Sequence, residues 1–224
     1  MRRIRRIKKT REEKTSGFFN HLDKIDKIYY INLEKRKDRK ESIEKELIKL
    51  DPEKEKTERI NAVEDKNGAL GCGKSHIIAL EKAIENGYEN ILIFEDDFKF
   101  HNIMGYLNEC LEEIFTTQKD YDIFLLGRNL KKHKRMSEKL IRVYSAQTTS
   151  GYLINKKFLP KLLECFKESV NMLENKISSS KAAIDIVWKK YQNDKYNFLS
   201  SVITIGYQLP SYSDIEKKFT DYQC

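Results

Sequence analysis

Three consecutive acids, Glu95, Asp96 and Asp97, directly follow the apolar run Ile91–Phe94. Carboxylates at this spacing raise one another's pKa unless a cation neutralises them, and a divalent metal ion is the usual partner. Oxygen ligands favour hard ions such as Mg²⁺ or Mn²⁺, which complete their shell with substrate phosphates. Strand alternation should turn Glu95 and Asp97 to one side, so we predict Asp97 as the main ligand, assisted by Glu95 or Asp96. The alternative interpretation is a solvated acidic turn that caps the next helix.

A second segment with chemical potential, Gly68–Ser75, matches the phosphate-loop pattern G-x-x-x-x-G-K-S letter for letter. In that motif backbone N–H groups surround nucleotide phosphates, and the lysine, here Lys74, reaches the terminal ones. The context is unfavourable, because the polar residues 64–67 separate the segment from the preceding apolar run, whereas a phosphate loop leaves a buried strand directly. A P-loop NTPase or kinase is therefore the alternative interpretation.

The elements that position these residues alternate between apolar runs of strand length and segments of helical period, which is typical of an α/β domain. The predicted strands are 27–33, 59–63, 91–95, 121–126, 140–144, 151–154 and 202–205, and the predicted helices are 38–50, 75–86, 103–115, 157–173 and 182–191. The apolar run that ends at Glu95 fits a buried parallel strand that delivers charge to the carboxyl edge of a sheet. We predict one domain over residues 26–224, with a mostly parallel central sheet and helices on both faces.

The positive charge of the chain is concentrated at its N-terminus. The formal net charge is +8, and residues 1–14 contain eight Lys or Arg and two Glu, so residues 15–224 carry only +2. A nucleic-acid-binding surface would keep its positive excess without such an arm, so nucleic acid is an unfavoured partner. We expect residues 1–25 to form a solvated, disordered basic arm, with an anionic membrane or glycan as its alternative partner.

The remaining composition points to a soluble protein of a reducing compartment. No apolar run approaches the roughly 18 residues that a membrane-spanning helix needs, and the N-terminus lacks the apolar core of a secretory signal. The four cysteines at 72, 110, 165 and 224 lie far apart without a Cys-x-x-Cys pair, so we expect free thiols. These features predict a cytoplasmic protein, with peripheral membrane association left open.

Several short motifs follow one another in order over about residues 26–216. They comprise Ile31-Asn32-Leu33 with Arg36 and Arg39, Ala62-Val63-Glu64-Asp65, Gly68, Gly71 and Cys72 with Ser75 and His76, Leu92–Asp97, Gly127, Tyr152, Asp185, and Gln208 with Ser213-Asp214-Ile215. Each motif alone is weak, but the collinear set resembles glycosyltransferase family 25, which includes bacterial lipopolysaccharide sugar transferases and collagen galactosyltransferases. In that family the glycine segment opens a helix without needing a lysine, which accounts for the accidental phosphate-loop pattern.

The resemblance implies a GT-A fold and inverting transfer from a UDP-sugar to a hydroxyl of a glycan or a hydroxylysine-type protein acceptor. It places Mn²⁺ or Mg²⁺ at Asp97 and Glu95, where the ion would neutralise the leaving pyrophosphate. Inversion requires a general base, and our candidate is Asp185, a carboxylate among apolar neighbours, for which a helix-surface aspartate is the alternative. The residues predicted to contact the donor, or the acceptor in the case of the last two, are Asn32, Arg36, Arg39, Ala62, Val63, Ser75, His76, Asp96, Gln208 and Asp214.

Alternatives accompany several of these residues. Arg36 and Arg39 are equally explained as surface charges at a helix start, and His76 as a structural histidine. A binding module that kept the fold but lost activity is another class, although the intact acid run argues against it. Loops such as 130–137 are expected to select the sugar and the acceptor.

Overall fold

The computed structural model describes residues 18–213 and 218–220. The basic residues 1–14, Asp214 and Cys224 lie outside the described residues. Residues 18–25, which the sequence analysis assigned to the arm, are folded onto the domain. Ile25 is fully buried, and the N–H of Asn20 donates to the side-chain oxygen of Asn108 in helix α4 (Met104–Thr116).

Eight strands form the central sheet in the order β2-β1-β3-β8-β5-β9-β7-β6. Their bounds are β1 Lys27–Asn32, β2 Thr57–Asn61, β3 Asn90–Glu95, β5 Ile123–Leu125, β6 Asn129–Arg135, β7 Leu140–Gln147, β8 Gly151–Asn155 and β9 Phe198–Ser201. All point in one direction except β8 and β7, which are antiparallel to both of their neighbours. The predicted α/β class with a mostly parallel sheet is therefore confirmed.

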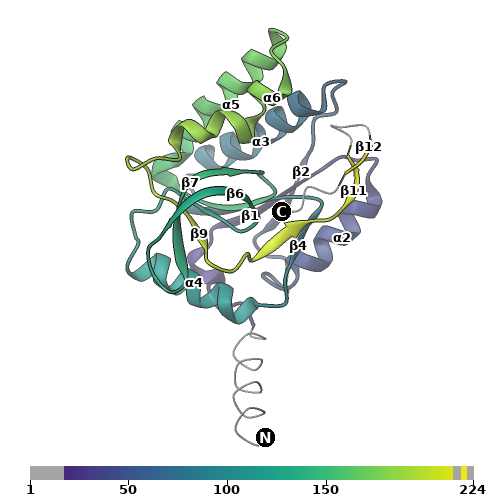
Figure 1. Cartoon of the computed structure of the whole chain (residues 1–224). Coiled ribbons are helices and arrows are strands. Elements are labelled where there is room, and N and C mark those ends of the chain that lie inside the picture. The colour runs from purple at the N-terminus through teal and green to yellow at the C-terminus, as the bar shows by residue number, and fades with distance from the viewer. Residues whose placement is uncertain (1–17, 214–217, 221–224) are drawn as a thin grey trace, which may run out of the picture.

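Helices cover both faces of this sheet (Figure 1). On one face lie α3 (Gly68–Glu85) and α5 (Leu159–Glu174), with the short helices α6 (Ser179–Ala182) and α7 (Ile184–Val187) and the 3₁₀ turns η2 (Lys156–Phe158) and η3 (Trp188–Tyr191). On the other lie α2 (Lys37–Leu47), α4 and the turn η1 (Leu22–Lys24). None of the described helices is long and apolar enough to cross a membrane.

Two cores bury the two faces of β3. Ile91 and Ile93 belong to the core under α3 and α5, whereas Leu92 and Phe94 belong to the core over α2 and α4. Burial on both faces explains why this strand is a continuous apolar run rather than an alternating one. It also fixes the point at which the chain emerges with its three acids.

Helix α3 begins seven residues earlier than the sequence suggested. The helical period predicted a helix from Ser75, and the family resemblance implied that the glycine segment opens a helix. Gly68–Ser75 forms the first two turns of α3. A methyl group on Gly71 would lie 2.5 Å from the carbonyl oxygen of Val63, so glycine allows the helix to pass close to the chain after β2. The glycines serve close packing here rather than a flexible loop.

Other differences occur where strands are short or exposed. The strand predicted at 202–205 lies at 198–201, and the helix predicted at 182–191 is divided between α7 and η3. Residues 130–137, expected to be a loop, mostly form the edge strand β6, whose basic residues are exposed and hide its strand character. The short strands β4 (Phe98–Phe100), β10 (Gly206–Gln208), β11 (Ser211–Ser213) and β12 (Lys218–Thr220) were not predicted.

Strands β4 and β10 pair directly after the acid run, and the ring of Phe98 holds this junction in place. Phe98 is fully buried and packs on Phe94 and Phe100, with ring centroids 4.9 Å away in both cases. A methyl group on Gly206 would lie 2.3 Å from Phe98 Cζ and 2.4 Å from the carbonyl oxygen of Lys99. Glycine at 206 therefore lets β10 approach the residue that follows Asp97.

Substituting Gly206→Ala should lower the free energy of unfolding by about 1–3 kcal/mol, because the added methyl overpacks this contact. Chemical denaturation measures the loss. In a double-mutant cycle the cost should be smaller in a Phe98→Leu background, since leucine lacks the clashing ring atoms. Gly87→Ala is the matched control, because no atom lies within 4 Å of its added methyl and its cost should be the same in both backgrounds. Equal costs of Gly206→Ala in the two backgrounds would contradict the packing argument.

Candidate active site

The acid run lies where β3 ends. Glu95 is the last residue of β3, and Asp96 and Asp97 form a turn before β4. Because β1, β2 and β3 are parallel, their carboxyl ends meet at the same edge of the sheet. The alternation expected of a continuing strand stops at Glu95: Asp96 and Asp97 share Arg39, whereas Glu95 turns toward His76.

Arg39 and Asn32 hold Asp96 and Asp97. Nη1 of Arg39, in the first turn of α2, lies 2.9 Å from an Asp96 oxygen and 3.2 Å from an Asp97 oxygen. Asn32, the last residue of β1, donates from Nδ2 to the other Asp96 oxygen at 2.7 Å. The three charged side chains are only 9–15% exposed, so this is a buried ionic cluster. Arg39 and Asn32, two of the residues predicted to contact the donor, therefore lie against the acids.

The charges of this cluster are unbalanced. Burial and the charge of Glu95 raise the pKa of Asp97 to about 7, although Arg39 acts in the opposite direction. Burial also raises the pKa of Asp96. Glu95 differs, because burial raises its pKa but the hydrogen bond with His76 helps to lower it overall. A divalent cation beside Asp97 would offset the cost of its ionisation, and the carboxylate oxygens of Asp97 and Glu95 are the ligand type that suits a hard metal ion.

A chain of hydrogen bonds links Asp97 to the predicted base. Gln208, the last residue of β10, donates from Nε2 to Asp97 at 3.3 Å and accepts from Thr148 Oγ1 at 2.7 Å. The backbone N–H of Thr148 donates to Asp185 at 3.2 Å. Thr148 has a φ of 76°, a conformation that costs a β-branched residue energy and is typical of functional sites. Three predicted residues are therefore brought together through a strained threonine that was not predicted.

A cavity of about 330 Å³ opens over this chain of residues. Burial raises the pKa of Asp185, which lies at the start of α7 on the wall of the cavity. The other polar side chains that line it include Cys72, Glu95, Asn129, Thr149, Ser179 and Gln208. Carboxylates and amides at the carboxyl edge of an α/β sheet are the usual setting of a ligand site.

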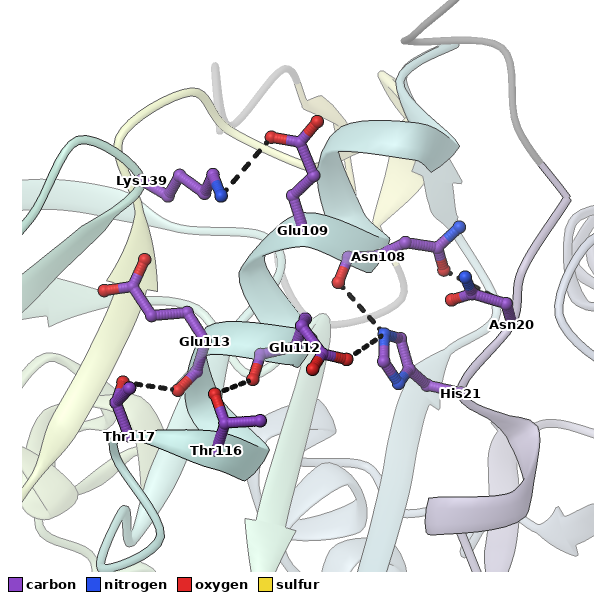
Figure 2. Close-up of a pocket in the computed structure, with 9 residues that line it drawn as sticks. All are labelled: Asn20, His21, Asn108, Glu109, Glu112, Glu113, Thr116, Thr117 and Lys139. Atoms are coloured by element: carbon purple, nitrogen blue, oxygen red, sulfur yellow. Dashed lines mark hydrogen bonds and ion pairs between the residues drawn. The ribbon is translucent and has the colours of Figure 1, made fainter.

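A larger cavity, of about 430 Å³, lies elsewhere, between residues 20–21 and the last turns of α4 (Figure 2). Several of its polar groups are paired with one another (Figure 2). Lys139 Nζ lies 3.5 Å from Glu109, and Nε2 of His21 lies 3.0 Å from the carbonyl oxygen of Asn108. None of its lining residues was predicted to do chemistry, so we place the candidate site in the smaller cavity.

Ala62 and Val63 belong to the loop after β2, and Ser75 and His76 belong to α3, which is joined to this loop. Ala62 and Val63 follow β2 at the carboxyl edge of the sheet. Ser75 Oγ accepts from the N–H of Val63 at 2.8 Å and donates to the carbonyl oxygen of Gly71 at 2.6 Å, so it ties α3 to this loop. His76 is fully buried and contacts the acid run through Glu95.

Arg36 is placed differently from Arg39. Its Nη2 lies 3.0 Å from an oxygen of Asp38, and its carbonyl oxygen accepts from Asn32 Nδ2 at 3.0 Å. The guanidinium of Arg36 lowers the pKa of Asp38 to about 2. Asp214, the alternative base and predicted donor or acceptor contact, lies outside the described residues.

The phosphate-loop alternative does not survive in the structure. Gly68–Ser75 is helical, and the N–H groups of Leu70 and Gly71 donate to the carbonyl oxygen of Asn67 instead of surrounding an anion. Nζ of Lys74 lies 3.1 Å from Glu174, away from the acid run. The match of Gly68–Ser75 to the phosphate-loop pattern is therefore accidental.

Thr148 and Thr149 are site residues that the sequence analysis missed. Thr149 donates from Oγ1 to Glu95 at 2.7 Å, and Thr148 joins Gln208 to Asp185. The signal that could have found them is the polar run 147–150 between two apolar strands. Strand β8 begins directly after this run and is the antiparallel neighbour of β3, so the run lies at the sheet edge where β3 ends in its acids.

Comparisons with known proteins agree with the motif order. The chain matches the model of glycosyltransferase family 25 (LPS biosynthesis protein) over residues 25–188, which confirms the resemblance. It is 28% identical to procollagen galactosyltransferase 1 of Danio rerio over 103 residues, 43% of this chain and 17% of the relative. With procollagen galactosyltransferase 2 of Mus musculus it shares 25% identity over 174 residues, 62% of this chain and 27% of the relative.

The chain is also similar to a relative named inactive and to a solved glycosyltransferase structure. The inactive glycosyltransferase 25 family member 3 of Homo sapiens is 34% identical over 62 residues, 27% of this chain and 10% of that protein. The chain thus covers at most 27% of the length of these three curated relatives. Among solved structures, a glycosyltransferase involved in the glycosylation of the major capsid of PBCV-1 is similar, with a TM-score of 0.52, 11% identity and coverage of 85% of this chain and 95% of that one. At this identity the likeness shows the fold alone.

Substituting Asp97→Asn should stabilise the metal-free protein above pH 7. The folded state raises the Asp97 pKa from 3.8 to about 7, so the stability this group contributes is complete below about pH 4 and is lost as pH rises through 7. Asparagine has no charge to bury, so the melting temperature of the variant should exceed that of the wild type at pH 8, and the difference should shrink as pH falls toward 4. Asp120→Asn, which removes the charge of a side chain that is 96% exposed, is the matched control. A variant less stable than the wild type at pH 8 would contradict the charge imbalance.

Proposed function

Because the chain belongs to glycosyltransferase family 25, we propose that it transfers a sugar from a UDP-sugar to a hydroxyl acceptor, with inversion and with help from Mn²⁺ or Mg²⁺. The observation that carries the proposal is the hydrogen-bonded chain from Asp97 through Gln208 and Thr148 to Asp185, beside an open cavity. It connects the acid cluster to a separate buried carboxylate, Asp185, on the wall of the cavity.

Asp97 and Glu95 are the residues that would hold the ion. Among the described residues, the ion pairs of Asp96 and Asp97 come from Arg39, whose single charge leaves the three carboxylates under-neutralised. The ion, when bound, supplies positive charge to the pyrophosphate as it leaves. Arg39 and Asn32 position Asp96 and Asp97, and Gln208 orients Asp97 from the side of the cavity.

Asp185 is the general base in this proposal. An inverting transfer needs a base that accepts the acceptor's hydroxyl proton while the new C–O bond forms and the bond to the UDP oxygen breaks. A raised pKa makes a carboxylate a stronger base, and burial has this effect on Asp185. The N–H of Thr148 fixes one carboxylate oxygen and leaves the other for the acceptor hydroxyl.

The donor and acceptor follow from the neighbours of the site. Ala62 and Val63, at the same sheet edge as Asn32, are proposed to contact the nucleotide with Arg36, whereas the predicted contact His76 is fully buried and reaches the site through Glu95. The names of the matched procollagen galactosyltransferases make a galactosyl donor and a collagen-type hydroxyl acceptor the first pair to test. A glycan hydroxyl is the second acceptor class. Because one matched relative is named inactive, a nucleotide-sugar-binding protein without transfer is the competing function.

Substituting Asp185→Asn should lower transfer by at least ~100-fold while UDP and Mn²⁺ affinity change little, because a general base contributes about 10²- to 10⁴-fold in rate. Asp97→Asn should abolish Mn²⁺-dependent transfer by weakening metal binding. Lys74→Ala is the matched control and should leave both transfer and UDP binding unchanged, since Lys74 pairs with Glu174. Transfer of a panel of UDP-sugars, with calorimetric UDP binding, measures all three variants.

Each outcome separates the alternatives. Normal transfer by Asp185→Asn would place the base elsewhere, with Asp214 the next residue to test. Loss of UDP binding in this variant would assign Asp185 to the donor. Full activity of Asp97→Asn, or of the wild type in excess EDTA, would refute metal dependence.

A further inference from the structure

A cluster of three potential metal ligands lies beside the acid run and is not explained by sugar transfer. The ligand atoms of Cys72, His76 and Glu95 all lie within 4.8 Å of one another. Cys72 and His76 are one turn apart on α3, and Glu95 faces them from the end of β3. The distance from His76 Nε2 to a Glu95 oxygen is 3.4 Å.

This spacing fits a tetrahedral ion. With bonds to zinc of about 2.3 Å from sulfur and about 2.0–2.2 Å from nitrogen or oxygen, two ligands of one zinc ion lie about 3.3–3.6 Å apart. The His76–Glu95 pair already has this separation. A small side-chain rotation of Cys72 suffices to complete three corners of a tetrahedron, because its sulfur already lies within 4.8 Å of both partners.

The residues around the cluster orient two of its ligands. The other ring nitrogen of His76, Nδ1, lies 2.9 Å from the hydroxyl of Tyr152, an acceptor that would leave Nε2 free to face the ion. Thr149 donates to Glu95 at 2.7 Å. Metal-bound histidines and carboxylates in proteins are held by such outer partners.

The cluster is also accessible from the cavity. His76 is fully buried, but Cys72 and Glu95 line the 330 Å³ cavity, which provides a path for an ion and an open fourth position. A role for Cys72 as a nucleophile is disfavoured, since burial and the carboxylates around it raise the pKa of its thiol.

We propose that Cys72, His76 and Glu95 form a binding site for a thiophilic divalent cation of the Zn²⁺ type, distinct from the hard-ion position at Asp97. A sulfur, a nitrogen and an oxygen ligand together select zinc-like ions over Mg²⁺ or Mn²⁺. Because Glu95 belongs to both proposed ligand sets, Zn²⁺ bound at this cluster would make Glu95 unavailable to the hard ion of the proposed function. Zn²⁺ would therefore inhibit this protein rather than replace Mn²⁺.

The test uses Co²⁺ as a spectroscopic probe of the full chain. One equivalent of Co²⁺ should produce a thiolate-to-cobalt charge-transfer band in the near ultraviolet, and added Zn²⁺ should remove it. The band should be absent in Cys72→Ser and present in Cys165→Ser, a control that removes a buried free thiol outside the cluster. Tyr152→Phe should keep the band but weaken Zn²⁺ binding about 10- to 100-fold, because it removes the partner of His76.

Further measurements keep the result independent of folding and of sugar transfer. ¹¹³Cd NMR of the unmodified chain should give one resonance in the range of a single thiolate with nitrogen and oxygen ligands. Asp97→Asn should retain the Co²⁺ band even though the proposed transfer is lost, so failure of one proposal is distinguishable from failure of the other. A folded wild type without the band, a band that persists in Cys72→Ser, or a cadmium resonance without a thiolate ligand would each overturn the site.

Discussion

Burial of Asp96 and Asp97 beside the partly buried Glu95 at the end of β3 is the constraint on which the rest of the site depends. An unpaired buried charge costs several kcal/mol, so each acid must find a partner within the fold. Asp96 and Asp97 share the guanidinium of Arg39, and Glu95 is held by His76. Arg39 belongs to α2 and His76 to α3, so the acid run links these two helices to the end of β3. Burial, together with the charge of Glu95, nevertheless raises the pKa of Asp97 despite the nearby Arg39.

Two glycines, which have no side chain, allow the segments that carry these partners to pack closely around the acids. Gly71 brings α3 near the chain after β2, and Gly206 brings β10 against Phe98, next to Asp97. Gln208, the last residue of β10, lies 111 residues after Asp97 in the chain and donates a hydrogen bond to it. The cavity is the space that remains between these pieces of chain. The same cavity is lined by Glu95 of the acid run and by the buried Asp185.

The sequence predicted what local patterns can encode. The apolar run 91–94 identified β3 and the position of its acids, because a strand buried on both faces has few other compositions. The helical period placed the start of α3 at Ser75 instead of Gly68, since glycines that serve helix packing look like loop glycines. The sequence analysis missed Thr148, whose role rests on a positive φ and on partners far away in the chain. The antiparallel direction of β8 and the short strand β10 depend on pairing, which the sequence of either strand alone does not express.

The central claim is that the acid cluster is a cation site whose charge is incomplete in the metal-free protein. Calorimetric titration with Mn²⁺, repeated in buffers of different ionisation enthalpy, counts the protons released on binding. Because the pKa of Asp97 is raised to about 7, the account predicts release of close to one proton near pH 6 and almost none above pH 8. Absence of Mn²⁺ binding, or a proton count that does not change between these pH values, would contradict it.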